Sequence, residues 1–119
     1  MLKNISVGPN GRVWGIDSAD DIYTRDGVNG KWQHIAGKLK NISVGANGRV
    51  WGVNSLDDIF TRDGVNGEWQ HIEGKLKQIS VSRSGRVWGV NSHDDIWTRD
   101  GLHGQWKQIE GKLTWVTQA

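Results

Sequence analysis

The sequence predicts an all-β protein built from three copies of one four-stranded antiparallel unit. Residues 2–8 return almost unchanged as residues 39–45 and again as 76–82, at a constant spacing of 37 residues. A period of this length is typical of solenoids, propellers and arrays. Short alternating segments are separated by Gly-rich turns, and no stretch shows the 3.6-residue period of an amphipathic helix. We interpret the chain as one segment, residues 1–119, with repeats 2–38, 39–75 and 76–112 and a partial copy at 113–119.

The second repeat shows the predicted strands most clearly. An Asn-Gly pair at 47–48 lies between two alternating segments, which is the strongest short signal for a β-hairpin. The segment that follows it is rich in β-branched and aromatic residues, as strands are. Polar and Gly-rich turns separate the later segments, and residues 73–75 are expected to close the unit. The four predicted strands are residues 42–44, 49–54, 59–62 and 69–72.

Such a sheet has two apolar faces and must bury both. Trp51 and Val53 point to one side of their strand, whereas Val50 and Gly52 point to the other. The unit therefore has to stack on copies of itself. Radial stacking of four-stranded sheets gives a β-propeller, which is known with roughly 4–8 blades, so three blades do not close a ring. We expect a homodimer that forms one six-bladed ring, and a trimer of nine blades is the poorer option.

The partial fourth copy adds a strand that a closed ring does not need. The first strand occurs four times if residues 113–119 are included, whereas the other three strands occur three times each. Either the N-terminal or the C-terminal copy completes the blade at the chain junction, and the sequence leaves both open. The low blade number favours a half-length or engineered version of a full ring.

These repeated positions resemble a known family. The pattern Val-Trp-Gly-Val-Asn-Ser at 50–55, Asp-Asp-Ile-Phe at 57–60 and the segment 69–81 resemble the tectonin repeat, and the first part recurs at 13–18 and 87–92. The resemblance covers essentially the whole chain. It implies a six-bladed propeller of the kind that tectonins and fish-egg lectins form to bind carbohydrate on cell surfaces. Some mushroom members favour O-methylated sugars. This chain departs from the family in having three blades.

The candidate binding residues all belong to the repeat. The Trp of the second strand is expected mainly to pack one blade on the next, with one edge lining a pocket between blades. The Asp and Asn residues between the second and third strands can bond sugar hydroxyls, or else simply shape the turn. The repeated Arg is expected to pair with an Asp, with a ligand contact as the alternative. The candidate ligand-binding residues are Trp14, Asp17, Asp20, Arg25, Trp51, Asn54, Asp57, Arg62, Trp88, Asn91, Asp94 and Arg99.

Composition argues against several classes of function. The 119 residues carry a formal net charge of +2, with 13 acidic residues interspersed among 15 basic ones. Without a basic stripe we expect no nucleic-acid partner, and without a long apolar run we expect no membrane insertion. The absence of cysteine excludes disulfides and thiolate metal sites. The start of the chain lacks the apolar core of a signal peptide, which favours a cytoplasmic location.

The repeat also argues against an enzyme. His34 and His71 are replaced by Gln108 in the third copy, so no column of catalytic histidines exists. The turn at 26–30 lacks the ligand spacing and the closing Glu of a calcium loop. Catalysis usually needs one well-built constellation of groups. We therefore expect no catalytic residue, no metal site and no cofactor.

Two functions are consistent with these observations. The first is a multivalent lectin that recognises cell-surface glycans, including O-methylated sugars, in pockets between blades. Eight Trp residues supply flat apolar surfaces, and repeated weak sites gain strength on a repeating target. The alternative is a protein-interaction ring, or a designed or reconstructed self-assembling propeller scaffold without sugar affinity. The near-identity of the first two copies motivates that alternative.

Overall fold

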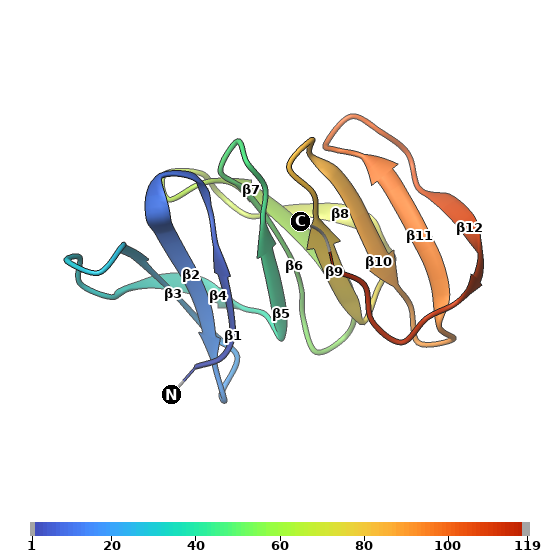
Figure 1. The fold of residues 1–119 in the computed structure, drawn as a ribbon. Helices are drawn as coiled ribbons and strands as arrows, with labels where there is room; N and C mark the ends of the chain where they lie inside the picture. The colour runs from blue at the N-terminus through green and yellow to red at the C-terminus, as the bar shows by residue number, and fades with distance from the viewer. Residues whose placement is uncertain (1, 118–119) are drawn as a thin grey trace.

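The computed structural model describes residues 2–117, which form three four-stranded antiparallel sheets (Figure 1). The first sheet contains β1 (Leu2–Val7), β2 (Arg12–Asp17), β3 (Asp21–Asp26) and β4 (Gln33–Lys38), with a short 3₁₀ turn at Pro9–Gly11. The second contains β5 (Asn41–Val44), β6 (Arg49–Val53), β7 (Asp58–Asp63) and β8 (Gln70–Lys75). The third contains β9 (Gln78–Val81), β10 (Arg86–Val90), β11 (Asp95–Asp100) and β12 (Lys107–Lys112).

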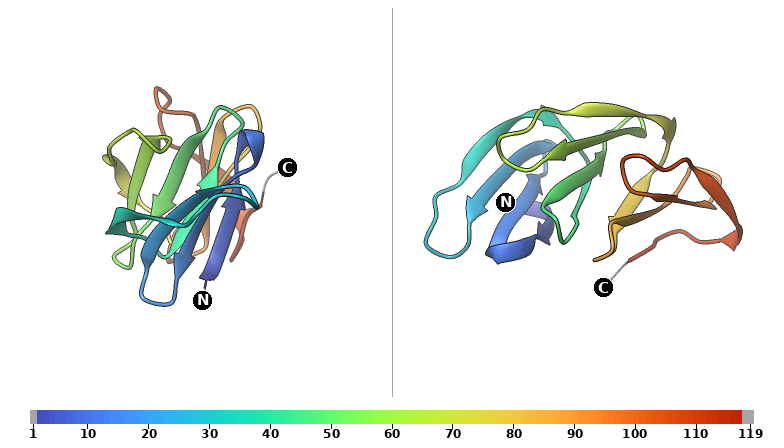
Figure 2. Two further views of the ribbon diagram at one scale, coloured as in Figure 1. Left: turned by 90° about the vertical axis from the view of Figure 1, so that its left-hand side faces the viewer. Right: turned by 90° about the horizontal axis from the view of Figure 1, so that it is seen from above.

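The three sheets are blades arranged side by side in an open arc. Within each sheet the strands follow chain order, so each blade is a simple meander. Seen from above, the first strand of each blade lies on the inner side of the arc and the fourth lies on the outer side (Figure 2). The predicted all-β fold of propeller blades with four antiparallel strands is confirmed.

The fourth strand of each blade is longer than the sequence predicted. Residues 73–75 were expected to close the unit, but β8 continues through them and Lys75 pairs with Asp58. An irregularity in the register between Asp58 and Ile59 makes this pairing possible. Gly74 supports it with a φ of 110°, a backbone conformation that glycine adopts without the steric penalty of a side chain.

The apolar core lies between the blades, as stacking requires. Trp14 and Ile16 on β2 are almost fully buried and share one apolar cluster with Ile42 and Val50 of the second blade. An equivalent cluster joins the second blade to the third. Gly52 leaves room for a leucine of its own blade, because an added Cβ atom would come within 2.5 Å of Leu39 Cδ1. A side chain at this position would displace the leucine that begins the blade.

Side-chain hydrogen bonds to the backbone fix each blade on the next. The Asn4 carbonyl oxygen accepts the Ile42 N–H at 2.7 Å, and the Asn41 carbonyl oxygen accepts the Ile79 N–H at 2.7 Å. Asn41 is only 5% exposed, so its hydrogen bonds form in a largely dry interface. These contacts set the register between neighbouring inner strands.

The C-terminal segment continues the same pattern without belonging to a strand. Gln78 accepts the Val116 N–H at 2.7 Å and donates to the Val116 carbonyl at 2.7 Å. The Leu113 N–H donates to the Asp94 carbonyl, as the Leu39 N–H does to Asp20. Residues 113–117 therefore lie beside β9 in the place that a fourth inner strand would take.

Candidate functional site

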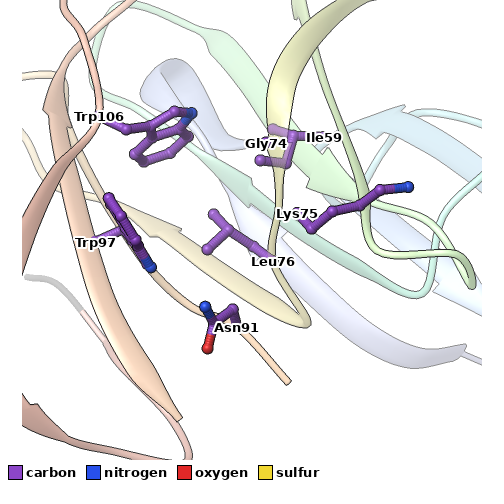
Figure 3. Close-up of a pocket in the computed structure, with 7 residues that line it drawn as sticks. All are labelled: Ile59, Gly74, Lys75, Leu76, Asn91, Trp97 and Trp106. Carbon is purple, nitrogen blue, oxygen red and sulfur yellow. The ribbon is translucent and has the colours of Figure 1, made fainter. Parts of the chain in front are cut away.

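Two cavities lie between adjacent blades, and the repeat relates them residue by residue. Their volumes are about 190 Å³ between the first and second blades and about 220 Å³ between the second and third. We call them the first and second interblade pockets. The first is lined by Ile22, Gly37, Lys38, Leu39, Asn54, Phe60 and Trp69. The second is lined by Ile59, Gly74, Lys75, Leu76, Asn91, Trp97 and Trp106 (Figure 3).

One wall of each pocket is an indole held in a fixed orientation. The Trp106 Nε1–H donates to the Glu73 carbonyl at 2.8 Å, across the gap between the second and third blades. The Arg99 guanidinium carbon lies 5.1 Å from the centre of the same indole. A Cβ atom added to Gly74 would lie 3.3 Å from Trp106 Nε1, so glycine leaves room for the ring. Trp69 is held in the same way by the Ala36 carbonyl at 2.9 Å.

One asparagine contributes an amide to each pocket. The Asn91 carbonyl oxygen accepts the N–H groups of His93 and Asp95, both at 3.0 Å, which shapes the turn between β10 and β11. Its amide nitrogen lies on the side of Trp97 (Figure 3). Since that nitrogen carries two hydrogens, it can help to bond the Asp95 carboxylate and still donate to a ligand. The oxygen of this side chain thus shapes the turn, while its nitrogen is left to the pocket side.

The lysine of each pocket presents its alkyl stem rather than its charge. The Lys75 ammonium donates to Asp58 Oδ1 at 2.5 Å and points away from the cavity (Figure 3). This hydrogen bond holds the pKa of the Asp58 carboxyl below its ordinary value. The lining is consequently apolar and aromatic, with the asparagine amide as its main polar group.

The tryptophans of the second strand lie away from both interblade pockets. Trp14 and Trp51 are each 1% exposed and are buried between blades, as the packing interpretation predicted. Trp88 occupies the same position in the third blade and is half-buried, because none of the described blades covers it. A sugar ring would therefore not stack on Trp14 or Trp51 in this arrangement.

The predicted pairing of the repeated arginine with aspartate is wrong. Among the described residues, no Arg–carboxylate ion pair forms at Arg25, Arg62 or Arg99. Arg62 instead donates to three carbonyls of the following turn, those of Gly64, Val65 and Gly67, at 2.5–2.9 Å. The carbonyls converge on the guanidinium because two glycines fold the turn tightly around it.

The same arginines also connect neighbouring blades. The Arg62 guanidinium carbon lies 5.8 Å from the ring centre of Trp14 in the preceding blade and 5.0 Å from that of Trp69. Arg99 stands 5.7 Å from Trp51 in the equivalent place. Burial lowers the pKa of the Arg62 and Arg99 guanidinium groups, although arginine stays charged at neutral pH.

The second candidate residue of each turn lies outside the two interblade pockets. Asp20, Asp57 and Asp94 adopt left-handed backbone angles, with φ of 68°, 66° and 65°. The Asp57 carboxylate is bonded by Lys40 at 2.5 Å, and Asp20 and Asp94 pair with the equivalent lysines. Of the two predicted residues in each of these turns, only the first, Asn54 or Asn91, lines an interblade pocket.

Sequence reasoning missed the aromatic walls. Trp69, Trp106, Phe60 and Trp97 are not among the candidate residues of the sequence analysis, yet all four line the pockets. The available signal was the glycine of the fourth strand, because Gly37 precedes Trp69 by 32 residues and Gly74 precedes Trp106 by the same number. Its lack of a side chain leaves space for an aromatic ring from the next blade.

Two other kinds of site were sought among residues 2–117. No group of three or more His, Asp or Glu side chains is placed to hold a metal ion there. Nor do these residues form a helix with the length and apolar character needed to cross a bilayer.

Comparison with known proteins places these features in context. The family model of the Tectonin domain matches residues 1–119. No curated protein matches the sequence. Among solved structures, YCF48 bound to D1 peptide is similar with a TM-score of 0.73 and 10% identity over 94% of this chain and 40% of that one. YCF48 from Cyanidioschyzon merolae gives 0.75, with 16% identity over 94% and 38%. Human WBSCR16 gives 0.74, with 9% identity over 98% and 42%.

These solved structures show the fold alone, since their identity to this chain is low. The chain spans about two fifths of the length of each of them.

Proposed function

Because the chain belongs to the Tectonin-domain family, we propose that it is a non-enzymatic lectin whose interblade pockets each bind one sugar of a cell-surface glycan. The observation that carries this proposal is the recurrence of one pocket, with an indole wall and a single amide, between both pairs of adjacent blades.

The pocket chemistry suits a pyranose ring or its methyl ether. Indole and phenyl faces contact the C–H face of a sugar, and the Asn54 or Asn91 amide donates to a hydroxyl or ether oxygen. Cavities for drug-sized ligands usually measure roughly 300–1,000 Å³, so these smaller ones suit a single ring. An O-methyl group would fit the apolar lining, which supports O-methylated sugars as ligands.

Ring closure by a second copy is part of the proposal. Ile5 and Val7 on β1 are 56% and 60% exposed, whereas their counterparts Ile42 and Val44 in the second blade are 3% and 9% exposed. Trp115, at the other end of the arc, is 57% exposed. Exposed apolar patches of this kind mark association sites, and two chains of three blades supply one six-bladed ring.

A glycan array that includes O-methylated sugars tests the lectin proposal. The wild-type chain should bind, and the double variant Asn54→Ala/Asn91→Ala should bind much less. Asp57→Asn is the matched control, because Asp57 belongs to the same turn but lies outside the pocket. Equal binding by all three proteins, or none by the wild type, would overturn the assignment.

A protein ligand is the second candidate. The apolar lining would also accept a hydrophobic side chain, and the similar fold of YCF48 was solved with a peptide bound. In this case a peptide array would give binding that Asn54→Ala/Asn91→Ala reduces, while the glycan array stays silent. A ring of the expected mass that is silent on both arrays would favour a self-assembling scaffold.

A further inference from the structure

Each interblade pocket is assembled from two halves that belong to different blades. In the second pocket, Ile59, Gly74 and Lys75 come from β7 and β8 of one blade. Asn91, Trp97 and Trp106 come from the next blade (Figure 3). An arc of three blades contains two complete pockets and, at its ends, one half of each kind.

The half at the C-terminal end of the arc keeps the backbone geometry of its counterparts. Gly111 on β12 has a φ of 112°, against 116° and 110° at Gly37 and Gly74. A Cβ atom added to Gly111 would meet only Ile96 within 4 Å, whereas one added to Gly74 would meet Trp106. The space that receives an indole elsewhere in the chain is thus open at Gly111.

The half at the N-terminal end is preformed in the same way. Tyr23 takes the position of Phe60 and packs on His34 with a centroid distance of 5.3 Å, the same distance as for Phe60 and His71. Trp32 takes the position of Trp69, but it is 44% exposed and its ring faces no glycine of a preceding blade.

This half carries two polar groups that the internal pockets lack, the Tyr23 hydroxyl and the Asp17 carboxylate. Asp17 replaces the asparagine, and its Oδ1 accepts the Ala19 and Asp21 N–H groups, both at 2.9 Å, as the asparagine oxygen does. Its second carboxylate oxygen therefore occupies the place of the amide nitrogen. A hydrogen-bond donor in the internal pockets becomes a charged acceptor here.

We propose that a second copy of this chain joins Ile96, Gly111 and Lys112 to the partner's Asp17, Tyr23 and Trp32, and that this seam pocket selects ligands that donate a hydrogen bond. The inference rests on the proposed lectin function and deepens it. Internal pockets accept a methyl ether, because the asparagine amide donates to its oxygen. The seam pocket binds a free hydroxyl or an ammonium group, since a carboxylate gains nothing from an ether oxygen.

The lysine of the seam pocket bonds another carboxylate and not Asp17. The Lys112 ammonium bonds Asp95 Oδ1 at 2.5 Å, as Lys75 bonds Asp58, and it turns away from the pocket side. The leucine position of the seam pocket is filled by Leu113 or by the partner's Leu2, and this choice does not alter the polar chemistry.

The test uses an array that carries each glycan in unmethylated and O-methylated form. Asp17→Asn gives the seam pocket an amide, and the reverse variant Asn54→Asp/Asn91→Asp gives the internal pockets carboxylates. Both changes preserve the turn, because Asp and Asn already shape it in this chain. We expect Asp17→Asn to shift the ratio of methylated to unmethylated binding roughly tenfold upward, and the reverse variant to shift it downward.

A pair of tryptophan variants separates the two kinds of pocket. Trp32→Ala should reduce binding of unmethylated glycans only, and Trp69→Ala should reduce binding of methylated glycans. Light scattering on the same samples should give twice the chain mass of 13.3 kDa.

The outcomes distinguish the two proposals. If the wild type binds glycans and Asp17→Asn leaves the ratio of methylated to unmethylated binding unchanged, the seam pocket is overturned but the lectin proposal stands. A ratio that responds to Asp17→Asn in a protein with the mass of one chain also overturns the seam pocket. A silent wild type overturns both proposals.

Discussion

The repeat offers an internal control for the contact between arginine and tryptophan across blades. Arg25 and Arg62 donate to equivalent turn carbonyls, at 2.5–2.8 Å and 2.5–2.9 Å. Of these two arginines, only Arg62 also stacks on the tryptophan of a preceding blade, Trp14, and it is only 7% exposed. Arg25→Met removes the contacts with the turn. Arg62→Met removes the equivalent contacts and also the contact with Trp14 of the preceding blade.

The expected difference between the two variants follows from these contacts. Water can replace part of the lost bonds at the turn, so we take their loss as about 2 kcal/mol in each variant. The cation–π contact adds about 1 kcal/mol at Arg62. With an unfolding entropy of about 2.1 cal/mol/K per residue, the 119 residues convert these losses into Tm decreases of about 8 °C for Arg25→Met and 12 °C for Arg62→Met.

Thermal unfolding followed by circular dichroism measures this difference, with light scattering at each concentration. In the proposed ring, Arg25 stacks on Trp88 of the partner subunit, so the two losses should converge as the mass doubles. Equal Tm decreases at a concentration where the chain is a monomer would refute the contribution of the contact between blades. A difference that persists after the mass has doubled would refute the ring geometry.

Three further predictions concern single contacts. Gln78→Leu removes both hydrogen bonds to Val116, so hydrogen exchange at the Val116 amide should become at least about tenfold faster. The Lys75 hydrogen bond lowers the pKa of the Asp58 carboxyl below its ordinary value of 3.8. The stability that this bond contributes is therefore present above the ordinary pKa and is lost as the pH falls through the lowered pKa of the folded state. In an acid titration, Asp58→Asn should lose less free energy of unfolding than the wild type. Leu76 is 2% exposed, and Leu76→Ala should lower the free energy of unfolding by about 3 kcal/mol in urea titrations.

The blade could be predicted from the sequence because its signals are local. The Asn-Gly hairpin, the alternating strands and the constant period each depend on residues close together in the chain. The prediction failed at residues 73–75, where a glycine looks like the end of a strand. Gly74 instead carries an irregular pairing that extends the strand, and only the partner strand shows this.

The pocket was harder to predict because its halves come from different blades. Asn54 and Asn91 were found, since polar groups in a turn are conspicuous. Trp69 and Trp106 were missed because their position just before the outer strand says nothing about the neighbouring blade. The arginine was assigned to an aspartate because charge pairing is the simplest expectation. Its actual partners are backbone carbonyls, which a sequence does not display.

In the proposed pockets, the first residue of each turn combines a folding role and a binding role in one side chain. The turn needs one oxygen that accepts two N–H groups, and Asp17 and Asn91 both supply it, at 2.9 Å and 3.0 Å. Stability therefore places little constraint on the choice between Asp and Asn. The remaining atom, a nitrogen or an oxygen, faces the ligand side, where the two residues have opposite hydrogen-bonding character. Exchange between them at 17, 54 or 91 should change what each pocket binds while the melting temperature stays nearly constant.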